Sequence, residues 1–96
     1  MADVDQPGPL LGRRLALHPQ VALRPEPFGA LAYHYLNRRL VFLKHPDVVR
    51  VVGSLADHAT VADTLVACGI APARYGAFER ALASMIDSEM LYDRAG

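Results

Sequence analysis

The sequence predicts an α+β domain in which a small antiparallel sheet packs on a bundle of three helices. Three observations support this fold class. Two apolar runs with strand composition, residues 28–36 and 39–44, are separated by two residues. A shorter extended run, residues 21–23, precedes them between prolines. After Pro46, apolar residues recur instead at the spacing of amphipathic helices.

Size and charge restrict what the chain can be. It has 96 residues with 52% hydrophobic content, which suits one domain with one modest core. Ten basic and ten acidic residues cancel, and a neutral chain without a basic face binds nucleic acid poorly. No apolar run reaches the ~20 residues of a membrane helix, and Met1 to Asp5 lack the features of a signal peptide. We therefore expect a cytoplasmic protein that binds neither nucleic acid nor membrane.

The N-terminal segment is expected to be an arm without regular structure. Pro7, Gly8 and Pro9 interrupt any element, and the leucines that follow have no sustained period. We therefore predict a flexible arm over residues 1–16 and a folded domain over residues 17–93. Within that domain, the flanking prolines place the first strand at an edge of the sheet.

The two longer strands are predicted to form a hairpin across Asn37 and Arg38. If these two residues are the whole loop, Tyr33 faces Phe42 and the bulky side chains share one face. A tight hairpin turn favours a positive φ at its second position, where this chain has Arg38 and not glycine. A three-residue connection, which would shift the pairing, is the alternative.

The second hairpin strand has apolar side chains on both faces, because Leu40 to Leu43 are apolar without interruption. A domain of this size can cover one face with its own core. The other face, or the open edge of the strand, needs a different cover, and an open edge can bind an added peptide strand. Burial of both faces by the domain's own helices is the alternative interpretation.

Three helices are expected after the hairpin. Pro46, followed by an acid, opens the first. Thr60 is a candidate N-cap for the second, with Asp63 three residues later, and Gly69 ends it. The third begins near Pro72. Its apolar stripe consists of Tyr75, Phe78, Leu82, Met85 and Ile86. Leu91 and Tyr92 form a last extended piece.

Side chains that could carry chemistry are few. The single cysteine, Cys68, excludes an internal disulfide and a multi-cysteine metal site, and it is expected to be a packed, unreactive thiol. The four histidines show no metal-ligand spacing. We therefore expect no catalytic residue, no metal and no cofactor.

Three stretches, residues 17–31, 38–44 and 54–58, resemble a known family. The most specific is the run His-Pro followed by Arg-Pro-Glu-Pro-Phe-Gly, within residues 18–29. From residue 18 to residue 91 the sequence is similar to the mycofactocin precursor-peptide chaperones. These are related to the chaperone of pyrroloquinoline-quinone biosynthesis and to RiPP recognition elements.

The resemblance implies a winged helix-turn-helix-like fold without catalytic activity. It also implies that the protein binds the leader of a ribosomally made precursor peptide as an added strand, against the third helix. The chaperone would then present the peptide to a radical SAM maturase. Carried over to this chain, the leader site comprises Arg39, Leu40, Val41, Phe42, Leu43, Lys44, Arg74, Tyr75, Phe78 and Leu82.

Two other roles, and one possible oligomeric state, remain open. A winged-helix DNA-binding domain needs a basic recognition helix, and residues 60–68 contain no lysine or arginine, which disfavours that role. A small subunit that only scaffolds a larger enzyme would bind the maturase without any peptide. An unfilled strand edge could also pair with a second copy in a symmetric homodimer.

Overall fold

The computed structural model describes residues 9–94. The strands and α-helices are β1 (Leu15–Leu17), β2 (Val21–Glu26), β3 (Gly29–His34), β4 (Leu40–Leu43), α1 (Pro46–Ser54), α2 (Val61–Ala67), α3 (Tyr75–Asp87) and β5 (Leu91–Asp93). Short 3₁₀ helices are η2 (Pro9–Gly12), η3 (Leu55–Asp57) and η4 (Pro72–Arg74). The predicted α+β architecture, a three-stranded antiparallel sheet with three helices, is confirmed. The likeness to a winged helix-turn-helix stays a prediction.

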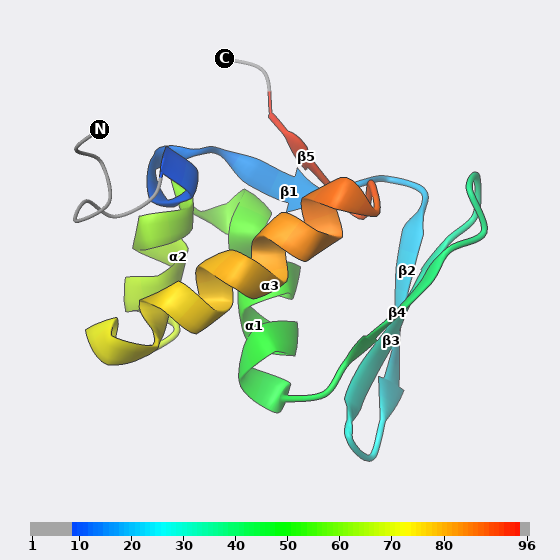
Figure 1. Cartoon of the computed structure of the whole chain (residues 1–96), viewed down its shortest axis with the longest axis horizontal. Coiled ribbons are helices and arrows are strands. Elements are labelled where there is room, and N and C mark those ends of the chain that lie inside the picture. Colours follow the sequence, from blue (N-terminus) through cyan, green and yellow to red (C-terminus); the bar gives the residue numbers. More distant parts are fainter. Residues whose placement is uncertain (1–8, 95–96) are drawn as a thin grey trace.

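The strands form two antiparallel sheets. The larger has the order β2-β3-β4, and the smaller pairs β1 with β5. Figure 1 shows the larger sheet along one side of the helices, with β1 and β5 across the end of the helical cluster. Since β3 is central, both β2 and β4 are edge strands of the larger sheet.

The segment before the large sheet is more ordered than the sequence suggested. Of the flexible arm expected over residues 1–16, residues 9–16 belong to η2, to β1 and to the link between them. Leu10 and Leu15 are buried in the core, so the expectation was wrong for this part. The physical reason is that β1 pairs with β5, from the opposite end of the chain, and local sequence carries no signal for that pairing. Residues 1–8 lie outside the described part.

The register of the β3–β4 hairpin differs from the predicted one. Tyr33 pairs with Leu40 rather than with Phe42, which instead pairs with Leu31. The loop is longer than expected, because His34 N–H donates to the carbonyl of Arg39 (3.0 Å) and the residues between them are the loop. Since the shift is by two positions, every side chain keeps its predicted face of the sheet.

Polar side chains in this loop and at the end of β3 accept hydrogen bonds from the loop backbone. Nδ1 of His34 accepts hydrogen bonds from the N–H groups of Leu36 (3.1 Å) and Asn37 (3.4 Å). Oδ1 of Asn37 in turn accepts from the N–H of Arg39 (2.9 Å). Arg38 takes the left-handed conformation itself, with φ 64°. The loop is therefore held by its polar side chains, which lower the cost of an arginine at positive φ.

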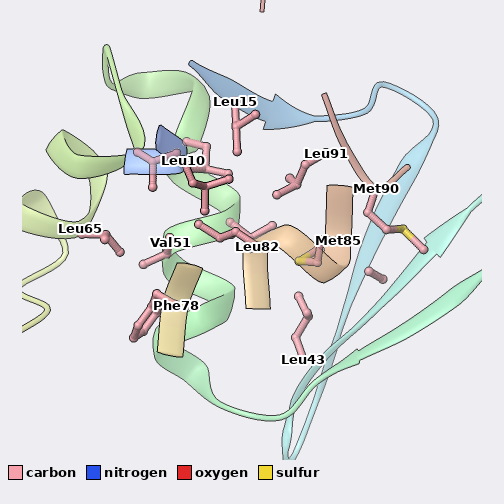
Figure 2. Close-up of a cluster of buried hydrophobic side chains, with 14 of the residues drawn as sticks. Leu10, Leu15, Leu43, Val51, Leu65, Phe78, Leu82, Met85, Met90 and Leu91 are labelled. Atoms are coloured by element: carbon pink, nitrogen blue, oxygen red, sulfur yellow. The ribbon is translucent and has the colours of Figure 1, made fainter. Parts of the chain in front are cut away.

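The core lies between the inner face of the larger sheet and the helices. Ala30 and Ala32 of β3 are fully buried and small, which allows the helices to approach the sheet closely. Figure 2 shows Leu43 of β4, Val51 of α1 and Leu82 of α3 converging on this core.

The helix boundaries follow the predicted signals. Thr60 caps α2, and its hydroxyl oxygen accepts from the N–H of Asp63 (3.1 Å). Gly69 follows the C-cap with φ 75°, which only glycine adopts without strain. Pro72 opens a 3₁₀ turn that runs directly into α3.

Two arginines stabilise the smaller sheet, which is formed by β1 and β5. Arg13 Nε donates to Asp93 Oδ1 (2.9 Å), and this hydrogen bond holds the pKa of Asp93 below its ordinary value. The guanidinium of Arg94 donates to carbonyls around η3. Those carbonyls belong to Leu55, Ala56, His58 and Ala59. The C-terminal end of β5 is thereby tied to η3 and the residues after it, as well as to β1.

Candidate functional site

An open cleft of about 320 Å³ lies between β4 and α3. Its lining residues are Val41, Phe42, Leu43, Lys44, His45, Val48, Ala81, Ser84 and Met85. On the helix side, Ala81 and Ser84 are small and stand one turn apart, beside the buried Met85. These short side chains leave space between the helix and the strand, so the cleft is mostly apolar and open to one side.

The backbone of β4 borders this cleft with unpaired edge positions. His34 and Arg39 form a hydrogen-bonded pair, since His34 N–H donates to the Arg39 carbonyl (3.0 Å). Hydrogen-bonded and non-hydrogen-bonded pairs alternate along antiparallel strands. The backbone groups of Val41 and Leu43 therefore point at β3. Those of Leu40 and Phe42 point at the free edge and can receive another strand.

The side chains of β4 are divided between the two faces of the sheet. Leu43 is buried and Val41 is half-buried on the inner face, next to the cleft. Leu40 and Phe42 are 55% and 59% exposed on the outer face. A strand added along this edge would continue the alternation, with every second side chain entering the cleft.

Two hydrogen bonds join the β3–β4 hairpin to the C-terminal end of α3. The guanidinium of Arg39 donates to the carbonyl of Asp87 (3.1 Å), and the side-chain amide of Asn37 donates to the carbonyl of Ser88 (3.1 Å). These two contacts hold the hairpin against the last turn of the helix. They therefore link the strand side and the helix side of the cleft.

Most of the strand residues predicted for the site do lie at the cleft. Val41, Phe42, Leu43 and Lys44 line it. Arg39 instead binds the end of α3, and Leu40 contributes its backbone to the free edge while its side chain lies on the outer face.

The helix residues predicted for the site lie elsewhere. Phe78 and Leu82 are 3% and 0% exposed and belong to the core. Arg74 donates to Asp47 (2.9 Å), a hydrogen bond that holds the pKa of the Asp47 carboxyl below its ordinary value, and its guanidinium lies over the Phe78 ring (5.2 Å). Tyr75 is half-buried against the core and is not among the lining residues.

The helix wall of the cleft was missed because apolar periodicity selects core residues. The actual wall lies beside that apolar stripe, where the side chains are short. A pair of small residues at helical spacing next to the stripe, Ala81 and Ser84, was the available signal.

Three other possibilities for residues 9–94 are a metal site, a membrane-spanning helix and a role for the single cysteine. No group of three or more His, Cys, Asp and Glu side chains there could hold a metal ion. None of the helices described is both long and apolar enough to span a bilayer. Cys68 is half-buried against the core, with its Sγ 3.6 Å from the Ser54 hydroxyl.

Comparisons with known proteins give consistent results. The sequence model of the peptide chaperone MftB family matches residues 14–92. The chain is 51% identical over 75 residues to the peptide chaperone MftB of Mycolicibacterium smegmatis, covering 78% of this chain and 74% of that protein. The protein of the same name from Mycobacterium ulcerans is 47% identical over 75 residues, covering 78% and 69%. That of Mycobacterium tuberculosis is 42% identical over 78 residues, covering 81% and 72%. No solved structure matches the chain.

Proposed function

Because the chain belongs to the peptide chaperone MftB family, whose members are non-catalytic, we propose that it binds the leader of a precursor peptide in mycofactocin biosynthesis. The leader is ribosomally made and adds to the sheet as a fourth strand beside β4. The chaperone presents this peptide to a radical SAM maturase. The observation that carries the proposal is the position of the free β4 edge directly beside an apolar cleft.

Energetics explain why the edge needs the cleft. Five backbone hydrogen bonds to an added strand contribute roughly 2.5–7 kcal/mol. Ordering six leader residues costs roughly 6–12 kcal/mol. The backbone bonds alone therefore do not produce binding. Each apolar leader side chain buried in the cleft adds ~1.5–3 kcal/mol, so the side chains supply most of the affinity.

The geometry restricts the leader sequence. Since side chains alternate along a strand, every second leader residue faces the cleft and is expected to be apolar. Charge at the two ends of β4 is basic, with Arg39 before the strand and Lys44 after it. Acidic residues flanking the apolar positions would suit these ends, because arginine and lysine pair with carboxylates.

Titration of ¹⁵N-labelled protein with the synthetic leader tests the proposal. The amides of Leu40 and Phe42 are expected to shift first, because their N–H groups would donate to the leader. Amides of Ala81 and Ser84 should follow as the cleft fills. A scrambled leader of the same composition is the control. Chemical-shift changes confined to amides of α2, which does not line the cleft, would contradict binding by strand addition.

A further inference from the structure

The outer face of the larger sheet is apolar and uncovered within the described structure. We call it the outer aromatic face. Its members are Phe28, Leu31, Tyr33, Tyr35, Leu40 and Phe42. Tyr35 is 58% exposed and Phe28 is 42% exposed. Side chains of this size usually lie inside a small domain, and clustered exposure of this kind is typical of an interaction surface.

The outer aromatic face is organised by ring contacts. The rings of Phe28 and Phe42 are 5.9 Å apart, and those of Tyr33 and Tyr35 meet edge to face at 5.2 Å. A shallow hollow of about 270 Å³ lies in this face. Its lining residues are Ala22, Arg24, Leu31, Tyr33, Tyr35 and Leu40. The surface therefore has an anchor point for an apolar group of a partner, which is how hot spots form in interfaces.

The segment that forms this face has an excess of basic residues. Residues 21–44, which span the larger sheet, contain four of the ten basic residues and one of the ten acidic residues. The remainder of the chain consequently has six basic against nine acidic residues. Arg24 and Lys44 are exposed, and the acid in this segment, Glu26, is paired with Arg24 (2.8 Å). A complementary partner surface is apolar at its centre and acidic around it.

The outer aromatic face continues into the proposed leader site. Leu40 and Phe42 contribute their side chains to this face and their backbone groups to the free edge. A leader strand beside β4 places every second side chain on this same face. The surface on this side of the sheet is therefore larger when the leader is bound than when the chaperone is empty.

We propose that the outer aromatic face is the docking surface for the enzyme that modifies the peptide, through an apolar patch with acidic surroundings on that enzyme. The leader's outward side chains complete this surface, so the enzyme binds the loaded chaperone more tightly than the empty one. This inference rests on the proposed function, since it takes the leader as the fourth strand. A second copy of the chain fits less well, because a twofold dimer through this face brings Arg24 and Lys44 toward the same basic residues of the other copy.

The test uses Tyr35→Glu, which places a negative charge on the outer aromatic face away from the leader edge. Calorimetry against the purified radical SAM maturase, with and without saturating leader, gives two affinities for each variant. Tyr35→Glu is expected to weaken maturase binding about tenfold or more and to change leader affinity less than about twofold. Val66→Glu is the control, because Val66 is also a large exposed hydrophobic residue (68% exposed) but lies on α2. It is expected to bind like the unaltered chain.

Three outcomes would overturn the proposal. If Tyr35→Glu binds the maturase as tightly as the unaltered chain, the outer aromatic face is not the docking surface. If the unaltered chaperone binds the maturase equally well with and without leader, the leader does not contribute to that surface. Concentration-dependent self-association that disappears in Tyr35→Glu assigns the face to a second copy. The leader titration of β4 amides is a separate readout, so its failure identifies an error in the proposed function and not in the docking surface.

Discussion

The two edges of the larger sheet, β2 and β4, differ in their capacity to accept another strand. On β2, Tyr35 N–H donates to the carbonyl of Gln20 (2.9 Å), so alternation turns the backbones of Val21, Leu23 and Pro25 toward the edge. Pro25 has no N–H, and the N–H of Val21 already donates to His18 (2.9 Å). Leu23 is left as the outward donor among these positions.

The β4 edge has neither obstruction. Leu40 and Phe42 both present N–H groups, and an apolar cleft runs beside them. The comparison shows that an edge position in the sheet does not by itself leave a strand open to pairing. One edge is protected against strand pairing by a proline and a local hydrogen bond, which is a common way to avoid aggregation. The other is open, and the neighbouring helix provides the surface that an added strand needs.

The largest expected effect comes from Gly29→Ala, which would damage the open edge itself. Gly29 has φ 148°, and an added Cβ would lie 2.1 Å from the carbonyl oxygen of Leu43. Strain at such a backbone conformation costs up to about 3 kcal/mol, and the contact with the β4 backbone adds to it. The free energy of unfolding, measured in urea, should fall by at least ~3 kcal/mol.

Gly53→Ala is the matched control for that substitution. Gly53 lies in α1 with no atom near its added Cβ, so alanine should raise the free energy of unfolding by about 0.5–1 kcal/mol. Equal stability of the two variants would show that β4 tolerates the contact at Gly29.

Filling the cleft should weaken leader binding while leaving the free edge of β4 intact. Ser84→Trp places a large ring where a leader side chain would enter, and loss of that burial corresponds to ~1.5–3 kcal/mol of binding free energy. Calorimetry with the leader measures this loss. Ala83→Trp, at an exposed position of α3 outside the lining, should bind normally. Equal affinities in both variants would mean that the leader does not enter the cleft.

Removing a single edge donor has a smaller expected effect. Phe42→Pro deletes an outward N–H, whereas Phe42→Ala deletes the side chain alone. The proline variant should bind the leader more weakly than the alanine variant by about 0.5–1.5 kcal/mol, the worth of one hydrogen bond. Circular dichroism checks that both are folded. By contrast, Val41→Pro should disrupt the hairpin, because its N–H points at β3. Indistinguishable leader affinities of the two Phe42 variants would indicate that this N–H points elsewhere.

The smallest effect is expected from Pro25→Thr, which opens the protected edge. It restores a donor on β2, and a surface change of this kind alters stability by less than about 0.5 kcal/mol. Leader affinity should stay unchanged, and self-association in analytical ultracentrifugation should rise. Binding of two leaders per chain would show that Pro25 alone prevents β2 from accepting a leader strand.

The elements that sequence predicted well are those fixed by local pattern. The apolar run of β4, the proline at the start of α1 and the Thr60 cap all act within a few residues. The register was wrong because the loop depends on the imidazole of His34, a contact that pattern alone does not reveal. The helix wall of the cleft was missed because apolar periodicity selects the core stripe, and Ala81 and Ser84 lie beside that stripe. The order of residues 9–16 depends on β5, from the far end of the chain.

The pairing of Leu15 with Asp93 has a practical consequence for engineering. The folded part of the chain is entered and left at one pole, and in the view of Figure 1 this pole lies at the top while the β2–β3 turn lies at the bottom. A linker that continues from this pole starts at the opposite end of this view from the β2–β3 turn. Fusing the proposed leader peptide through a flexible linker at this pole would convert its binding into an intramolecular event, with an effective concentration in the millimolar range.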